Sequence, residues 1–131
     1  MKVYVAAPWT CKDEAKEAAD RLEAAGHTIT QKWWQHREVP GYLVTEDPAV
    51  VEELWTQVVG DMQGVMEADV FVLLNLGLSE GKAVETGMAL CSQTCQFFYL
   101  VGERSNLFHY ATEWLILPSI EDVIDDLSLY S

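Results

Sequence analysis

Short apolar runs alternate with helix-periodic segments along the whole chain, and this alternation predicts an α/β protein. The expected strands cover Lys2–Ala7, His27–Lys32, Asp69–Asn75, Gln96–Val101 and Thr112–Leu117. The expected helices cover Cys11–Ala25, Pro48–Glu67, Glu80–Ser92, and a last segment from Pro118-Ser119 to Leu129. Nearly continuous apolar strands separated by helices are typical of a parallel sheet that is covered on both faces.

Local signals support several of these boundaries. Thr10 is a candidate N-cap for the first helix, and Gly26 ends it. Asp47 precedes a proline at the first helical position of the second helix. Between these helices, Gln35–Asp47 is the only long connection that we predict, and connections of this length are often functional.

Five strands in this arrangement predict one flavodoxin-like (Rossmann-like) domain over residues 1–131, with the strand order 2-1-3-4-5. In such a sheet, ligands bind beyond the carboxyl ends of the strands, where the order reverses between strands one and three. The segments Ala6–Thr10 and Asn75–Gly81 are therefore expected to line the site.

The charge of the chain limits its partners. The 131 residues contain 8 Lys and Arg against 21 Asp and Glu, a formal net charge of −13. Nucleic acid and anionic membrane surfaces are excluded as partners, because both need clustered basic side chains. We find no basic leader followed by an apolar run and no apolar stretch that spans a bilayer, so we expect a cytoplasmic protein.

The cysteines and histidines indicate no metal site. Cys11, Cys91 and Cys95 lack the spacing of zinc ligands, and we expect reduced thiols. Neither His36 nor His109 has a metal-ligand partner nearby in the sequence. We therefore expect neither a metal ion nor a cofactor, and the loop after the first strand lacks the Ser/Thr-rich phosphate cradle of flavin carriers.

Asp61 breaks the pattern of the helix over Pro48–Glu67. At about 100° per residue it falls at the inner edge of the apolar stripe, where an ionised carboxylate costs free energy unless it is paired or used. Alternatively, it is a rim carboxylate that reaches solvent, helped by Gly60 and Gly64, which loosen the helix. The helical wheel alone favours neither interpretation.

Glu85 is the second anomaly, because the other residues of its helix are mostly apolar or small. Such a helix is buried, so Glu85 is expected to point into the core or into a pocket. A local ion pair with Lys82 is the alternative. Small neighbours such as Ala83 and Gly87 leave room for a ligand, and we favour a functional role.

The first and third strands are followed by further candidates. Tyr4 lies on the first strand, and Trp9 follows its end, where the indole packs on a loop or stacks on a ligand. Trp33 and Trp34 are expected to pack one on each face of the end of the second strand. In Asn75–Gly81, backbone N–H groups and a Ser hydroxyl suit an oxyanion or a sugar hydroxyl, although glycines and a Ser after a strand most often form an ordinary turn with an N-cap.

Taken together, these residues resemble the nucleoside 2-deoxyribosyltransferase superfamily, including its nucleotide N-glycosidase branch. The resemblance extends from Lys2 to about Tyr110. It rests on an ordered set: Val3–Trp9, the Gly26-His27 turn, Asp61 eight residues before Asp69, Ser79–Ala89, and Leu100–Arg104.

The resemblance implies a role for each matching residue. Glu85 matches the nucleophile that attacks C1′ of the sugar and forms a glycosyl-enzyme ester. Asp61 matches a carboxylate that assists proton transfer to the base, and Tyr4 matches a tyrosine that positions the nucleophile. An oxocarbenium-like centre needs two carboxyl groups in different environments. The residues implied to bind substrate are Ala6, Ala7, Trp9, Ser79, Gly81, Asn106 and His109.

The resemblance also implies a homodimer or higher homo-oligomer with shared active sites, in which residues 105–109 of a neighbouring subunit complete the site. Trp55, Phe108 and Tyr110 are candidates for apolar surface between subunits.

Three functions follow from these residues. The first is transfer of 2-deoxyribose between nucleobases through a Glu85 ester. The second is hydrolysis of a nucleoside 5′-monophosphate, favoured by Ser79, which stands where nucleoside-using relatives carry Asp. Three features argue against a phosphate on the substrate: the net charge of −13, Glu80, and the absence of a basic residue from the loop after the first strand. In that loop, Trp9 resembles a base-stacking aromatic of the nucleoside branch. The third is a non-catalytic nucleotide-binding module.

Overall fold

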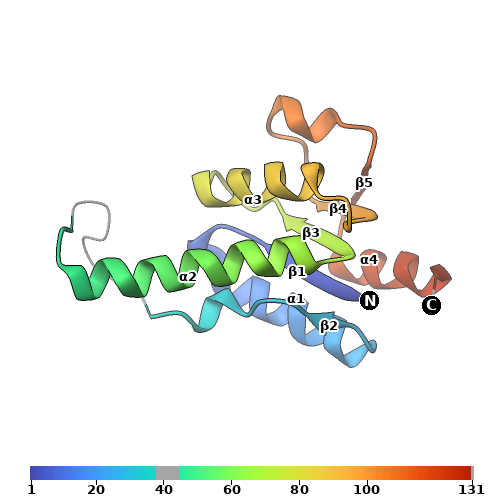
Figure 1. The fold of residues 1–131 in the computed structure, drawn as a ribbon. Helices are drawn as coiled ribbons and strands as arrows, with labels where there is room; N and C mark the ends of the chain where they lie inside the picture. Colours follow the sequence, from blue (N-terminus) through green and yellow to red (C-terminus); the bar gives the residue numbers. More distant parts are fainter. Residues whose placement is uncertain (38–44, 131) are drawn as a thin grey trace.

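Five parallel strands form one sheet in the order β2-β1-β3-β4-β5, which confirms the predicted flavodoxin-like α/β fold (Figure 1). This computed structural model describes residues 1–37 and 45–130. The strands are β1 (Lys2–Ala6), β2 (Thr28–Ile29), β3 (Val70–Leu74), β4 (Phe97–Val101) and β5 (Trp114–Leu117). All five residues of β3 are buried, as expected for a central strand covered on both faces.

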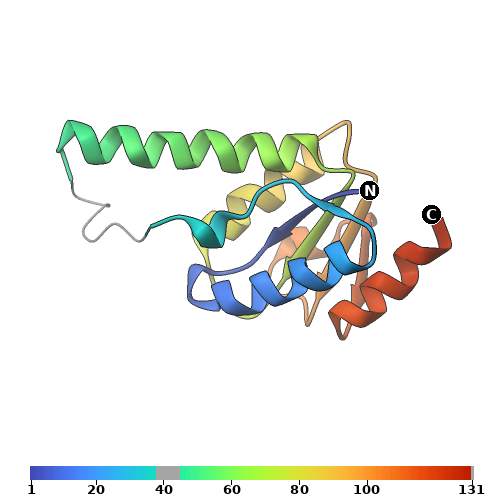
Figure 2. The same ribbon diagram turned by 90° about the horizontal axis from the view of Figure 1, so that it is seen from below.

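Four helices cover the two faces of the sheet. They are α1 (Lys12–Ala24), α2 (Pro48–Glu67), α3 (Glu80–Cys91) and α4 (Ile120–Leu127). Figures 1 and 2 show α2 and α3 on one face and α1 and α4 on the other. Short 3₁₀ turns lie at Trp9–Cys11, Trp33–Gln35, Leu107–Tyr110 and Ser128–Tyr130. None of the helices in the described part of the chain is long and apolar enough to cross a membrane.

Most predicted boundaries agree with the structure within two residues, but the second strand is much shorter than predicted. It covers Thr28–Ile29 instead of His27–Lys32. After Ile29 the chain turns away from the sheet toward α2, and the Thr30 hydroxyl donates a hydrogen bond to the carbonyl oxygen of Gly64 at 2.8 Å. Backbone pairing with β1 ends at the hydrogen bond from the Thr30 N–H to the carbonyl oxygen of Val3 at 2.9 Å, while the Thr30 side chain bonds to α2. The predicted connection Gln35–Asp47 lies partly outside the described residues.

The prediction for Trp33 and Trp34 is wrong. Both residues lie in a 3₁₀ turn, not on opposite faces of a strand. Trp33 is buried, and its indole N–H donates to the carbonyl oxygen of Val5 at 2.7 Å. A buried indole needs such a partner, and the turn places it at the end of β1. Trp34 packs edge-on against Trp33, with ring centroids 5.6 Å apart.

The predicted N-caps were partly correct. Asp47 and Ser79 cap α2 and α3, since their side chains accept hydrogen bonds from backbone N–H groups two and three residues later. Thr10 does not cap α1, because a 3₁₀ turn intervenes and α1 begins at Lys12 without a side-chain cap bond. Gly26, with a φ of 98°, ends that helix as expected, since a left-handed φ favours glycine.

The two helices over the site expose more apolar surface than their patterns imply. In α2 only Gly64 and Val65 are buried, and the remaining large apolar side chains are half-buried or exposed. The helix packs on the rest of the protein through the side that carries Gly64 and Val65. The other part of its apolar stripe is exposed, and it comprises Val51, Trp55, Val58, Met62 and Met66. In α3, which we expected to be buried all round, Val84 is 63% exposed.

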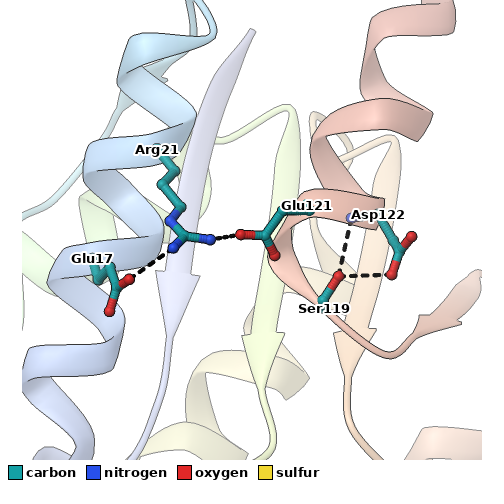
Figure 3. A network of polar contacts seen from close by, with 5 residues as sticks. All are labelled: Glu17, Arg21, Ser119, Glu121 and Asp122. Atoms are coloured by element: carbon teal, nitrogen blue, oxygen red, sulfur yellow. Dashed lines mark hydrogen bonds and ion pairs between the residues drawn. The ribbon is translucent and has the colours of Figure 1, made fainter.

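A polar network joins α1 to the start of α4 on the far face of the sheet (Figure 3). The Arg21 guanidinium of α1 contacts the carboxylates of Glu17 and of Glu121 in α4. The Ser119 hydroxyl caps α4 and contacts Asp122. Exposed ion pairs of this kind contribute roughly 0.2–1 kcal/mol each, so the network aligns the two helices more than it stabilises them.

Candidate active site

A tyrosine and a glutamate that are far apart in the sequence meet between β1 and α3. Tyr4 is wholly buried in β1, and its ring stacks on Phe71 of the adjacent β3 with centroids 5.9 Å apart. Its hydroxyl donates a short hydrogen bond to Oε2 of Glu85, in the second turn of α3. The sheet thus holds the donor rigidly, and the helix brings the carboxylate to it.

The environment of Glu85 favours its neutral form. Burial raises the pKa of the Glu85 carboxyl from 4.5 to about 8. The local ion pair with Lys82 that we considered is not formed, because the Lys82 ammonium donates instead to Oδ1 of Asn75 at 2.6 Å and to the carbonyl oxygen of Gly77. A buried carboxyl with a strongly raised pKa is typical of a functional site.

Asp61 belongs to a second polar group, next to the first. It is half-buried in α2, and its Oδ1 accepts a hydrogen bond from Nε2 of Gln31 at 3.1 Å. The same Gln31 nitrogen lies 3.3 Å from Nε2 of His36. Burial raises the pKa of Asp61, although the Gln31 hydrogen bond and the charge of His36 oppose the shift. A carboxyl with a raised pKa is suited to donate a proton.

Two glycines of α2 bring these groups together. A Cβ on Gly64 would lie 2.6 Å from Cβ of Gln31 and 3.1 Å from the Tyr4 ring, so only glycine allows this close approach. A Cβ on Gly60 would lie 2.8 Å from Nε2 of Gln31. α2 is continuous from Pro48 to Glu67. Gly60 and Gly64 therefore serve close packing beside Asp61, and they do not interrupt the helix.

The loop after β1 contributes a packed aromatic group. Ala6 and Ala7 are buried at the end of the strand. Trp9 is half-buried against Trp33, with ring centroids 6.1 Å apart, and the Lys12 ammonium lies 5.1 Å from the centroid of the Trp9 ring. Trp9 therefore packs on neighbouring aromatic and basic side chains at the carboxyl end of β1.

Three other predicted residues line a separate cavity on a different face of α3. The cavity has a volume of about 250 Å³, and Ser79, Asn106 and His109 line it together with Lys82. Ser79, Lys82 and Thr86 share one side of the helix, whereas Glu85 lies on another. The predicted Gly81 is exposed in the first turn of α3.

His109 is the most enclosed polar residue of this cavity, with 2% of its surface exposed. Its Nδ1 accepts a hydrogen bond from the backbone N–H of Ser105 at 2.9 Å, and its Nε2 lies 3.3 Å from Nδ2 of Asn106. Burial lowers the pKa of His109, and the charges of Lys82 and Arg104 lower it further. Residues 105–109, which were expected to complete the site of a neighbouring subunit, therefore also lie beside Ser79 of their own chain.

Sequence reasoning missed Gln31 and assigned no role to His36. Gln31 lies near the end of the predicted second strand, and His36 lies in the predicted connection, so neither position breaks a periodic pattern. Lys82 was considered only as an ion-pair partner, whereas the structure places this residue in the lining of the cavity, with its ammonium bonded to Asn75. The described residues contain no cluster of three or more His, Cys, Asp or Glu side chains that could hold a metal ion.

Comparison with solved structures supports the resemblance at the level of the fold. A 2-deoxyribosyltransferase from the psychrotolerant bacterium Bacillus psychrosaccharolyticus superposes with a TM-score of 0.68 at 20% identity, over 95% of this chain and 91% of that one. The CMP N-glycosidase BcmB of Clostridium botulinum superposes with a TM-score of 0.59 at 18% identity, over 99% of this chain and 100% of that one. No protein-family model and no curated protein matches the sequence. The chain thus has the fold of these two solved enzymes.

Proposed function

We propose that this protein is an enzyme that cleaves the N-glycosidic bond of a deoxynucleoside and transfers the 2-deoxyribosyl group to another nucleobase. The observation that carries the proposal is the hydrogen bond from the Tyr4 hydroxyl to the buried carboxyl of Glu85. Such a rigid and desolvated carboxyl suits a nucleophile. The fold shared with a 2-deoxyribosyltransferase and a CMP N-glycosidase supports this class of reaction.

The two carboxyl groups have different roles in the reaction, with Glu85 as the nucleophile and Asp61 as the proton donor and acceptor. An oxygen of ionised Glu85 attacks C1′ while the C1′–N bond breaks. The electron pair of the C1′–N bond passes to the departing base, which takes a proton from Asp61. The ester on Glu85 is then attacked at C1′ by a nitrogen of the second base, which loses a proton to the Asp61 carboxylate. The ester bond breaks and Glu85 is restored.

The hydrogen bonding of Glu85 distinguishes its two oxygens. Oε2 accepts the Tyr4 hydroxyl, so Oε1 is the oxygen that attacks. With a pKa of about 8, roughly a tenth of Glu85 is ionised at pH 7 before substrate binds. Positive charge that develops at C1′ stabilises the ionised form, so the buried carboxyl interacts most strongly with the transition state.

The proposal is tested by incubating the protein with a deoxynucleoside and a different free base, then identifying the products. We expect the exchanged nucleoside, and we expect none from Glu85→Ala. A 2-fluoro sugar analogue should leave an ester that mass spectrometry locates on Glu85. An active Glu85→Ala variant contradicts the mechanism, and tight nucleotide binding without release of base favours a non-catalytic binding module.

A second candidate function is hydrolysis of a nucleoside 5′-monophosphate, and the cavity beside α3 favours it. Ser79, Lys82 and His109 line that cavity. Lys82 forms no ion pair with any carboxylate of the described residues, although the chain carries a net charge of −13. Turnover of a nucleoside compared with that of its monophosphate separates the two functions. A Lys82→Met variant that loses only monophosphate turnover favours the second.

A further inference from the structure

The segment of residues 31–37, which follows β2, runs alongside α2 and is bonded to it at both ends. At its start, Nε2 of Gln31 donates to Oδ1 of Asp61 at 3.1 Å. At its end, the Arg37 guanidinium donates from Nε and Nη2 to the two carboxylate oxygens of Glu53. The contacted position on α2 falls from 61 to 53 while the segment advances, so the two lie antiparallel (Figure 2).

A buried anchor fixes the middle of this segment and, with it, the place of His36. The indole of buried Trp33 is bonded to the carbonyl oxygen of Val5 at the end of β1. The 3₁₀ turn that begins there closes with a hydrogen bond from the His36 N–H to the carbonyl oxygen of Trp33 at 3.0 Å. The half-buried imidazole is thereby held against Gln31, with its Nε2 3.3 Å from Nε2 of that amide.

The Gln31 side chain itself is closely packed against α2. It occupies the space that Gly60 and Gly64 leave, since a Cβ on either glycine would lie within 2.8 Å of a Gln31 atom. One rearrangement preserves the shape of a packed amide, namely a half-turn that exchanges its nitrogen and its oxygen. The polar neighbours of the amide must therefore decide its orientation.

His36 is one of the two neighbours that decide it. Nε2 of Gln31 carries two hydrogens and faces two acceptors, Oδ1 of Asp61 and Nε2 of His36. A ring nitrogen accepts only when it carries no proton, so the neutral imidazole has its hydrogen on Nδ1. A half-turn of the amide would bring Oε1 of Gln31 against the lone pair on the ring nitrogen.

The contact with His36 matters most when Asp61 carries a proton. An ionised Asp61 accepts from the amide nitrogen without any help from the imidazole. A protonated Asp61 suits both orientations of the amide, because its Oδ1 either accepts from Nε2 of Gln31 or donates a proton to Oε1. The lone pair on His36 selects the first orientation, in which Oδ1 accepts and the proton is carried by Oδ2.

We propose that His36, acting through Gln31, is a positioning residue that keeps the proton of Asp61 on Oδ2, from which it is transferred to the departing base. The proposal rests on the proposed function, because the place of this proton matters only if Asp61 protonates a base. His36 acts on the proton-transfer step alone, so its loss should affect only those bases that need a proton to leave.

Initial rates with two kinds of deoxynucleoside test the proposal, one whose base needs a proton to leave and one whose base does not. His36→Phe keeps a planar ring and removes the acceptor, so kcat/KM should fall by roughly 3- to 10-fold for the first kind and stay unchanged for the second. His36→Gln offers a carbonyl acceptor and should restore part of the loss. Gln35→Ala is the matched control, because Gln35 is exposed in the same turn, and it should change neither rate.

A second measurement needs no substrate. Nitrogen NMR shifts of the neutral His36 imidazole in the wild type should show a hydrogen on Nδ1 and none on Nε2. The opposite tautomer overturns the proposal, and so do equal losses for both kinds of base in His36→Phe. If His36→Phe does not fold, Gln31→Leu replaces it, with the same dependence on the base expected. A wild type that releases no base overturns the proposed function and this proposal with it, whereas the other two outcomes overturn only the role of His36.

Discussion

The hydroxyl of Tyr4 is the one polar atom of β1 that touches the proposed nucleophile, so Tyr4→Phe is the sharpest perturbation of the site. The variant removes the donor to Oε2 of Glu85 and leaves the ring stacked on Phe71. A hydrogen bond to a charged acceptor contributes about 1.5–3 kcal/mol. Losing it disfavours the ionised form of Glu85, which the reaction requires.

The expected effect on the reaction follows from that free energy. At pH 7, kcat/KM should fall by roughly 10- to 150-fold. For a base that leaves without protonation, and so does not need the Asp61 proton, the acidic limb of the wild-type pH profile should follow the Glu85 pKa of about 8. Without the Tyr4 donor that pKa should rise by about one to two units, because one unit corresponds to about 1.4 kcal/mol. Activity should therefore recover partly at high pH.

The assay is initial-rate release of base from a deoxynucleoside across neutral and alkaline pH, with thermal unfolding as the control for folding. A purely structural role of Tyr4 predicts a lower melting temperature and an unchanged pH profile. An unchanged kcat/KM and an acidic limb at the wild-type position would falsify the assignment of Tyr4 as the residue that supports ionised Glu85.

Three further predictions concern Glu85, Asp61 and the glycines of α2. Because the pKa of Glu85 is raised, wild-type stability should fall as pH rises from about 4.5 to about 8, and Glu85→Gln should remove this dependence in thermal unfolding. Asp61→Asn should lower the rate of deoxyribosyl transfer by roughly 10²- to 10⁴-fold, and the loss should be smaller for a base that leaves without protonation. Equal losses for all bases exclude Asp61 as the proton donor. In denaturant unfolding, Gly64→Ala should lower the free energy of unfolding by about 1–3 kcal/mol, since the new Cβ meets the Cβ of Gln31. Gly60→Ala should lower it less, because its Cβ meets only the movable side-chain amide of Gln31. Equal losses for the two variants refute the close-packing argument.

Part of the candidate site could be recognised from the sequence because two of its residues violate local patterns. Asp61 interrupts an apolar stripe, and Glu85 stands in a helix of small and apolar residues. Gln31 and His36 interrupt no pattern, because polar residues are ordinary at the end of a strand and in a connection. Their position beside Asp61 depends on the short second strand and on the close approach of α2 at Gly64.

The sequence by itself determined the α/β class, because the hydrophobic period of each segment is a local property. It suited the strand order 2-1-3-4-5 without fixing it, since the chirality of crossover connections permits few arrangements but more than one. Tertiary structure alone decided which residues meet. Tyr4 and Glu85 are 81 residues apart and come together only when α3 packs over β1. It also decided that part of the apolar side of α2 is left exposed, because a helical period shows that an apolar side exists but not what covers it.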